Sequence, residues 1–265
     1  MIFPFAIPAF SDNYIWLIAA DNINSPGQAD NAENMVVIID PGTADPVIKC
    51  LQDNKLQPCA ILVTHHCYDH TNGISALCQH YNLPVYGPAN SIIPELSHPL
   101  HDNDEISLEN NLSFQVMATP GHTLDHLCYY RPGMLFSGDT LFSAGCGRIK
   151  EGSPAQMFKS LTRLANLPDN TQIFCTHEYT LANLKFAQQV EPENNNIKTR
   201  LAYIQQQRDE GQITLPSTMA EEHRSNPFLR CSEPSVMAAA SRFAQRPVKG
   251  PEDTFKIIRF WKDTW

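Results

Sequence analysis

The sequence has few basic residues and no long hydrophobic run, and both absences narrow the possible functions. Its 265 residues include 19 Lys and Arg against 28 Asp and Glu, which gives a formal net charge of −9. Nucleic acid is bound through clustered Lys and Arg, so it is not expected as a partner. No apolar run approaches the roughly 20 residues of a membrane-spanning helix, so a membrane is not expected either. With 42% hydrophobic residues the chain can still bury a full core, which excludes a disordered protein.

Signs of a disulfide framework and of a secretion signal are also lacking. The eight cysteines are scattered, whereas disulfide frameworks are typical of short secreted chains. The apolar stretch 1–8 has no basic segment and is broken by Pro4 and Pro8, unlike a signal peptide. The sequence therefore indicates a cytoplasmic protein with reduced cysteines, and we expect a monomer.

Apolar patterns and turn residues predict two domains with a boundary near residue 180. The first, 1–179, alternates strands with helices, which is typical of an α/β or α+β sandwich. The second, 180–265, is predicted to be helical, with an irregular stretch over 213–230. Asp45 is the expected N-cap of a helix, and 22–34 an expected surface loop. Strands are expected at 14–18, 35–39, 60–63, 85–86 and between 106 and 136, and helices at 45–52, 73–81, 154–165, 180–190, 196–210, 235–244 and 252–262.

His and Asp residues follow the ends of several apolar runs. These are 60–63 before His65, Cys67, Asp69 and His70, 114–117 before His122, 134–136 before Asp139, and 172–175 before His177. A buried strand that ends at a metal-binding side chain holds it rigidly and leaves an open coordination position. A single His of this kind is usually a hydrogen-bonded structural residue, but the cluster predicts a metal site. His66 is not expected to be a ligand, whereas Asp40 and His126 are candidates to orient the ligands or are ordinary buried polar residues.

Longer strings resemble a known family. The metallo-β-lactamase superfamily carries HxHxDH, then GH, GD and a late His, and the segment from His65 to His70 is similar to the first motif with one His exchanged. The stretches similar to glyoxalase II, the hydroxyacylglutathione hydrolases, are 141–148, 177–187, 226–230 and 259–263. The resemblance covers nearly the whole chain. It implies an αββα sandwich followed by an all-α glutathione-binding domain, and metal-dependent hydrolysis of S-D-lactoylglutathione to D-lactate and glutathione, as in methylglyoxal detoxification.

The same resemblance implies two divalent metal ions, with zinc expected and iron or manganese as alternatives. The implied ligands are His65, Cys67 and His122 for the first metal, Asp69, His70 and His177 for the second, and Asp139 as a bridge. Asp69 and Asp139 are the implied catalytic carboxylates. The implied substrate-binding residues are Arg148, Tyr179, Arg259 and Lys262. Arg259 and Lys262 lie three positions apart on an expected helix and therefore share one face.

Cys67 stands where the family carries a His. A thiolate binds zinc at about 2.3 Å, against roughly 2.0–2.1 Å for an imidazole nitrogen. If the usual His binds through Nδ1, a Cys sulfur reaches almost as far; if it binds through Nε2, the loop must shift. The negative thiolate weakens Lewis acidity and favours softer metals. We therefore expect a first metal site that is retained but weaker than the second.

Two alternatives to the hydrolase stay open. Persulfide dioxygenases share this fold with a single iron, and Cys67 is compatible with a one-metal site. A degenerate member that binds glutathione conjugates without turnover is the second alternative. The helical tail with Arg259 and Lys262 favours the hydrolase over the dioxygenase.

Overall fold

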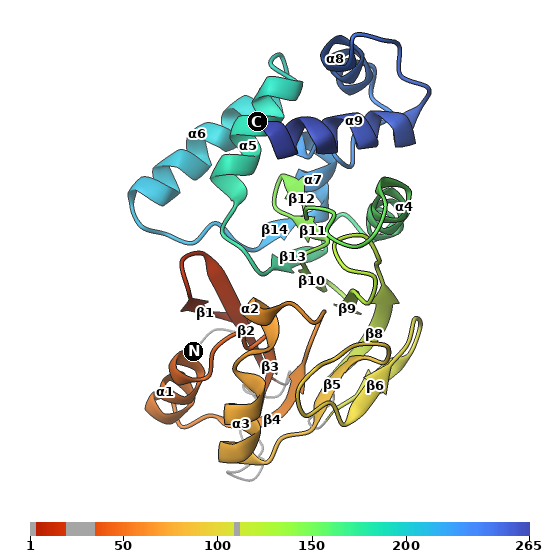
Figure 1. Ribbon diagram of the computed structural model, residues 1–265. Coiled ribbons are helices and arrows are strands. Elements are labelled where there is room, and N and C mark those ends of the chain that lie inside the picture. The colour runs from red at the N-terminus through yellow and green to blue at the C-terminus, as the bar shows by residue number, and fades with distance from the viewer. Residues whose placement is uncertain (1–3, 20–34, 109–111) are drawn as a thin grey trace. The chain divides into compact units, whose positions relative to one another are not determined.

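The computed structural model describes residues 4–19, 35–108 and 112–265 (Figure 1). The expected loop at 22–34 and the first residues of the apolar N-terminal stretch lie outside this part. The chain divides into two compact units, each described by itself below. The first comprises Met1–Ala118 and Asp125–Arg131, and the second comprises Thr119–Leu124 and Pro132–Trp265. The domain boundary at residue 180 stays a prediction.

The first unit contains a sheet with the strand order β1-β2-β3-β4-β5-β6. The strands are β1 (Phe5–Ala9), β2 (Asn13–Ala19), β3 (Met35–Ile39), β4 (Gln57–Leu62), β5 (Val85–Pro88) and β6 (His98–Leu100). β1, β2 and β3 pair antiparallel, and β3 to β6 pair parallel. Parallel neighbours end at the same sheet edge, so the residues after β3 and β4 meet there. The Thr64 amide donates to Asp40 Oδ1 at 2.7 Å.

Helices α1 (Asp45–Asp53) and α3 (Ile74–Tyr81) pack on this sheet (Figure 1). Val47 and Leu51 of α1 are buried among the strand side chains. The predicted N-cap was wrong: Ala44 occupies that position without a side-chain cap. Asp45 is the first helical residue instead, where its charge complements the helix dipole. The unit also holds α2 (Tyr68–Thr71) and the antiparallel strands β7 (Glu105–Ser107), β8 (Ser113–Ala118) and β9 (Leu127–Arg131).

The second unit contains parallel strands β10 (Met134–Gly138) and β13 (Gln172–Cys175), with β14 (Ser217–Thr218) antiparallel to β13. Two short strands, β11 (Leu141–Phe142) and β12 (Gly145–Cys146), form a ribbon. The helices are α4 (Pro154–Leu164), α5 (Thr180–Val190), α6 (Asn195–Asp209), α7 (Met219–Ser225), α8 (Pro234–Ala244) and α9 (Pro251–Thr264). Leu184 of α5 and Ile197 of α6 share one buried cluster, and Figure 1 shows these helices side by side. Within the described ranges, no helix is long and apolar enough to cross a bilayer.

The expectation of an irregular stretch over 213–230 was wrong, because it contains β14 and α7. The Thr218 side chain accepts a hydrogen bond from the Glu221 amide and so caps α7. The Thr-x-x-Glu pattern is a known start signal. Helix α7 has only seven residues. A helix this short does not show the apolar periodicity on which the prediction of helices depended.

A buried polar network holds the β11–β12 ribbon against α6 and α7. The Glu222 carboxylate accepts from the Ala144 amide at 2.7 Å, from Asn226 Nδ2 at 2.9 Å and from Arg200 Nη2 at 2.9 Å. Asn226 Nδ2 also donates to the Gly145 carbonyl at 2.9 Å. A fully buried charge is tolerated only when it is satisfied in this way. The conformation of the ribbon therefore depends on side chains from the C-terminal helices.

Candidate metal and substrate site

In the first unit, the predicted ligands follow β4 and lie at the start of α2. His65 and His70 are fully buried. His65 Nδ1 lies 3.0 Å from Thr64 Oγ1, and His70 Nδ1 lies 3.0 Å from Asp40 Oδ2. Thr64 Oγ1 in turn donates to Asp40 Oδ2 at 2.7 Å. Hydrogen bonds at Nδ1 fix the ring orientation and direct Nε2 the other way, as in metal-binding histidines.

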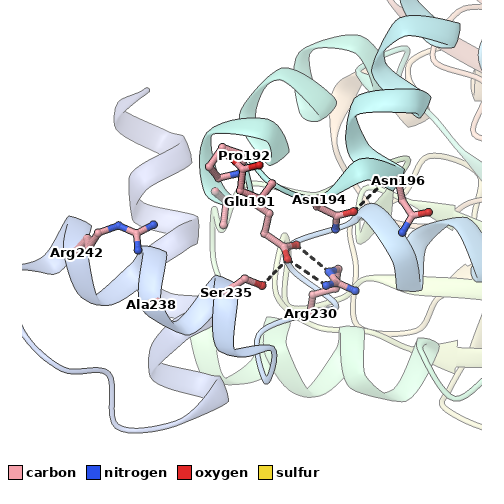
Figure 2. A pocket seen from close by; sticks show the side chains of 10 residues that line it. Glu191, Pro192, Asn194, Asn196, Arg230, Ser235, Ala238 and Arg242 are labelled. Atoms are coloured by element: carbon pink, nitrogen blue, oxygen red, sulfur yellow. Dashed lines mark hydrogen bonds and ion pairs between the residues drawn. The ribbon is translucent and has the colours of Figure 1, made fainter.

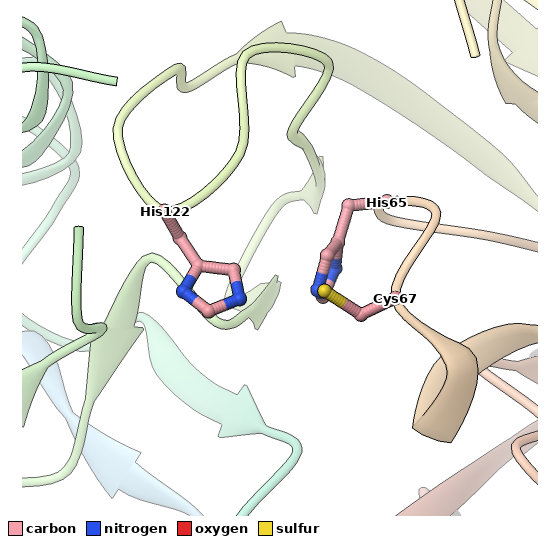
Figure 3. Close-up of side chains that lie close together, drawn as sticks. All are labelled: His65, Cys67 and His122. Atoms are coloured by element: carbon pink, nitrogen blue, oxygen red, sulfur yellow. The ribbon is translucent and has the colours of Figure 1, made fainter. Parts of the chain in front are cut away.

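Cys67 lies close to the His65 imidazole, and Asp69 lies close to the His70 imidazole. Figure 3 shows the Cys67 thiol beside the His65 ring, and their ligand atoms lie within 4.8 Å of each other. Asp69 Oδ2 lies 3.6 Å from His70 Nε2 and accepts from Asn13 Nδ2 at 3.0 Å. Asn13 is buried on β2 and was missed in the sequence, because a lone polar residue on an apolar strand carries no spacing signal.

The predicted supporting residues of this unit also contact the ligands. The His126 ring stacks on His65 with 4.8 Å between centroids, and Asp40 holds His70 as described. His66 Nδ1 instead lies 2.9 Å from Asp125 Oδ2. The four predicted ligands of the first unit are therefore brought together, while His66 pairs with a carboxylate.

In the second unit, Asp139 lies between two imidazoles. His122 Nε2 is 3.5 Å from Asp139 Oδ2, and His177 Nε2 is 3.3 Å from Asp139 Oδ1. His122, drawn in Figure 3, has its Nδ1 2.7 Å from the Arg148 carbonyl oxygen. Each carboxylate oxygen thus faces the Nε2 atom of a different ring.

A glycine lies against the backbone of each of the two candidate carboxylate ligands, Asp69 and Asp139. A Cβ on Gly42 would lie 1.9 Å from the Asp69 carbonyl oxygen, and one on Gly147 would lie 1.9 Å from that of Asp139. Both distances are far below van der Waals contact, so any other residue would displace the ligand. Neither glycine was predicted to contact a candidate ligand, since close backbone approach leaves no residue pattern.

The donor set fits divalent metal ions. Imidazole and thiolate suit zinc and other soft or borderline ions, and carboxylates add negative charge. The buried imidazoles with anchored Nδ1 atoms, and the carboxylate oxygens that face Nε2 atoms, supply the features of ligating groups in both units.

The predicted substrate residues all lie in the second unit. The Tyr179 ring stacks on His177 with centroids 4.7 Å apart. Arg259 is 4% exposed and donates from Nη1 to the Cys146 carbonyl at 2.9 Å. Lys262 Nζ donates to Asn183 Oδ1 at 2.7 Å. Arg148 is exposed, and its Nε lies 3.3 Å from Asp263 Oδ1.

Lys262 has an unusual environment for an ammonium group. Burial lowers its pKa to about 8, and the neighbouring positive charge of Arg259 contributes to the shift. Its Nζ also lies 5.0 Å from the centroid of the Phe186 ring, a cation–π contact that favours the charged form. The charge of Lys262 is therefore sensitive to pH near the physiological range.

A separate hollow of about 410 Å³ lies beside α5, α6 and α8 (Figure 2). Glu191 accepts from Arg230 Nε at 2.8 Å and from Ser235 Oγ at 2.6 Å. Burial alone would raise the pKa of Glu191, but these bonds outweigh it and leave the pKa below its ordinary value. The charges at its centre are thus paired with one another, and none of the predicted site residues lines it.

Two families match successive parts of the chain. Residues 31–177 match the metallo-beta-lactamase superfamily, and residues 178–265 match the family described as hydroxyacylglutathione hydrolase C-terminus. The fold and the His and Asp clusters thus define a metallo-β-lactamase-type protein, a class that uses divalent metal ions.

Similar proteins indicate which family within this class the chain belongs to. A hydroxyacylglutathione hydrolase of Chromohalobacter salexigens is 48% identical over 260 residues, or 97% of each chain. One of Nitrosomonas europaea is 44% identical over 266 residues, or 100% of this chain and 97% of the relative. The chain belongs to the hydroxyacylglutathione hydrolase family, glyoxalase II. The resemblance predicted from the sequence is confirmed.

Solved structures agree on the fold. ETHE1 from Myxococcus xanthus is 27% identical with a TM-score of 0.65, covering 97% of this chain and 90% of that one. TTHA1623, solved in a di-iron-bound form, is 25% identical with a TM-score of 0.58, covering 86% of this chain and all of the other. The α/β fold with a helical C-terminal part is thereby confirmed.

Proposed function

We propose that this protein hydrolyses S-(2-hydroxyacyl)glutathione, with S-D-lactoylglutathione as the substrate and D-lactate and glutathione as products. The observation that carries the proposal is the Asp139 carboxylate, whose two oxygens face two different imidazoles. That geometry suits a dinuclear hydrolase. Family membership supports the glutathione thioester as substrate.

The ligands of the two units are proposed to close one centre with two metal ions. His65, Cys67 and His122 would hold the first, Asp69, His70 and His177 the second, and Asp139 both. Zinc is the metal we expect from this mixture of imidazole, thiolate and carboxylate. Two bound metal ions supply Lewis acidity toward a carbonyl oxygen and lower the pKa of a water molecule.

The residues of the chain provide positioning rather than acid catalysis. A thiolate leaves a thioester without a strong general acid, so a Ser–His–Asp arrangement is not required. Asp40 holds His70, and the Arg148 carbonyl holds His122, so neither ring needs to reorganise during turnover. Tyr179, stacked on His177, limits the movement of that ring.

Basic residues from α9 and from the segment after β12 are proposed to bind the substrate's carboxylate. Arg259 and Lys262 lie on the same face of α9, as their spacing predicted, and Arg148 follows the β11–β12 ribbon. Charge-assisted hydrogen bonds to a carboxylate are about twice as strong as neutral ones. The three cations therefore offer an anchor for an anionic glutathione moiety.

The test is hydrolysis of S-D-lactoylglutathione by metal-loaded protein, followed as loss of thioester absorbance. We expect turnover that a chelator abolishes and that added zinc restores. Iron content with oxygen uptake on glutathione persulfide would instead favour the dioxygenase. Binding of S-methylglutathione without any hydrolysis would favour the degenerate binder.

Substrate binding is expected to depend on pH through Lys262. The ammonium is charged below its pKa, so its attraction for a carboxylate is complete well below pH 8 and is lost as the pH rises through about 8. We expect kcat/KM, which reports ionisations of the free enzyme, to fall about three- to tenfold between about pH 7 and about pH 9.5. A steady-state pH profile measures this.

Lys262→Arg is the matched control, because a guanidinium keeps its charge throughout this range. Its profile should be flat on the alkaline side. An equal alkaline decline in wild type and Lys262→Arg would show that another group titrates.

A further inference from the structure

Asp263, in the last turn of α9, lies between two of the proposed substrate-binding arginines. One carboxylate oxygen, Oδ1, is 3.0 Å from Arg259 Nη2 and 3.3 Å from Arg148 Nε. The Arg259 side chain is 5% exposed and that of Asp263 30%, so this pair is partly shielded from solvent. An internal carboxylate thus occupies the place where an external one is expected to bind.

The charges around Asp263 make this contact consequential. Arg148, Arg259 and Lys262 carry three positive charges, and Asp263 neutralises one of them. A ligand carboxylate that approaches the arginines must share or displace Asp263 Oδ1. The ligand then gains little Coulomb energy, because one carboxylate beside the arginines is exchanged for another. If both carboxylates stay, they repel each other at close range.

We propose that Asp263 is a built-in competitor for the ligand's carboxylate, which weakens the binding of glutathione conjugates and speeds the release of glutathione. The inference rests on the proposed function, because it assigns regulation of the same substrate site. Arg259 is held independently by the Cys146 carbonyl and by the Phe228 ring, 5.0 Å from its guanidinium. When the charge of Asp263 is removed, Arg259 therefore stays in place and attracts an anion more strongly.

The experiment compares wild type with Asp263→Asn, which keeps the shape and removes the charge. S-methylglutathione, which cannot be hydrolysed, is titrated by calorimetry, and KM and product inhibition are measured with S-D-lactoylglutathione. We expect the Kd, the KM and the inhibition constant of glutathione all to fall about two- to fivefold, the size typical of one partly exposed charge pair.

Two comparisons separate competition from a merely structural role, and a second variant guards against poor folding. Glu252→Gln makes the same charge change on α9 at an exposed position and should leave the Kd unchanged. An S-methylglutathione analogue with its glycine carboxylate replaced by a carboxamide should bind wild type and Asp263→Asn equally. Asp263→Ser is the second variant, expected to repeat the gain if Asp263→Asn folds poorly.

The outcomes distinguish the two proposals. Active wild type with an unchanged or raised Kd in the Asp263 variants would overturn the competitor role, a raised Kd indicating that Asp263 orients the arginines. Wild type that neither binds S-methylglutathione nor hydrolyses the thioester would overturn the proposed function, and the present inference with it.

Discussion

Asp139→Asn is expected to lower kcat/KM for S-D-lactoylglutathione by about 10³-fold or more, a loss of several kcal/mol of transition-state stabilisation. The carboxylate faces His122 and His177 through different oxygens, and an amide offers only one oxygen and no charge. The substitution should therefore also reduce the metal retained after dialysis. Elemental analysis of the dialysed protein, alongside steady-state kinetics, measures both effects.

Asp209→Asn is the control, since this exposed residue at the end of α6 contacts only Gln205 among the bonds described. It should retain wild-type metal content and activity. An Asp139→Asn protein that is folded, carries two metal ions and turns over at the wild-type rate would remove Asp139 from the centre.

Cys67→Ala is expected to lower affinity for the first metal ion by at least about 100-fold, with most of the activity lost. The thiol lies beside His65, and a methyl group cannot coordinate. In cobalt-loaded wild type, a sulfur-to-metal charge-transfer band should appear in the near-ultraviolet spectrum. Cys67→His should lose the band but keep both metal ions, and bind the first more tightly than wild type does.

Cys78→Ala is the matched control, because Cys78 is another half-buried cysteine of the first unit and donates only to the Leu83 carbonyl among the bonds described. Its cobalt spectrum should equal that of wild type. Wild type with two sites of equal strength would contradict the predicted weak first site, and a band that persists in Cys67→Ala would assign the sulfur elsewhere.

The sequence predicted the strands that lead into the candidate site, because an apolar run marks each of them in the sequence. β4 precedes His65, β10 precedes Asp139 and β13 precedes His177, each within three residues. Runs of apolar side chains indicate the strands, and the change to polar residues indicates where each strand ends. The local residue pattern was therefore sufficient to predict these three strands.

Other features could not be predicted, because they depend on contacts distant in sequence. Asn13 reaches Asp69 across 56 positions, and Arg259 reaches Cys146 across 113. Gly147 is required by the closeness of another backbone segment, which no spacing records. Whether the predicted boundary at residue 180 separates independent domains depends on the same kind of contact.

The network around Glu222 has a consequence for exchanging parts between relatives. The ribbon that follows Asp139 has its Ala144 amide and Gly145 carbonyl satisfied by side chains beyond residue 220. A chain shortened to end at residue 179 would leave these backbone groups without those bonds. A chimaera with the C-terminal segment of another protein would therefore keep these bonds only if that segment placed a Glu and an Asn at the same two positions. The helical part is thus a portion of the catalytic scaffold and not an interchangeable attachment.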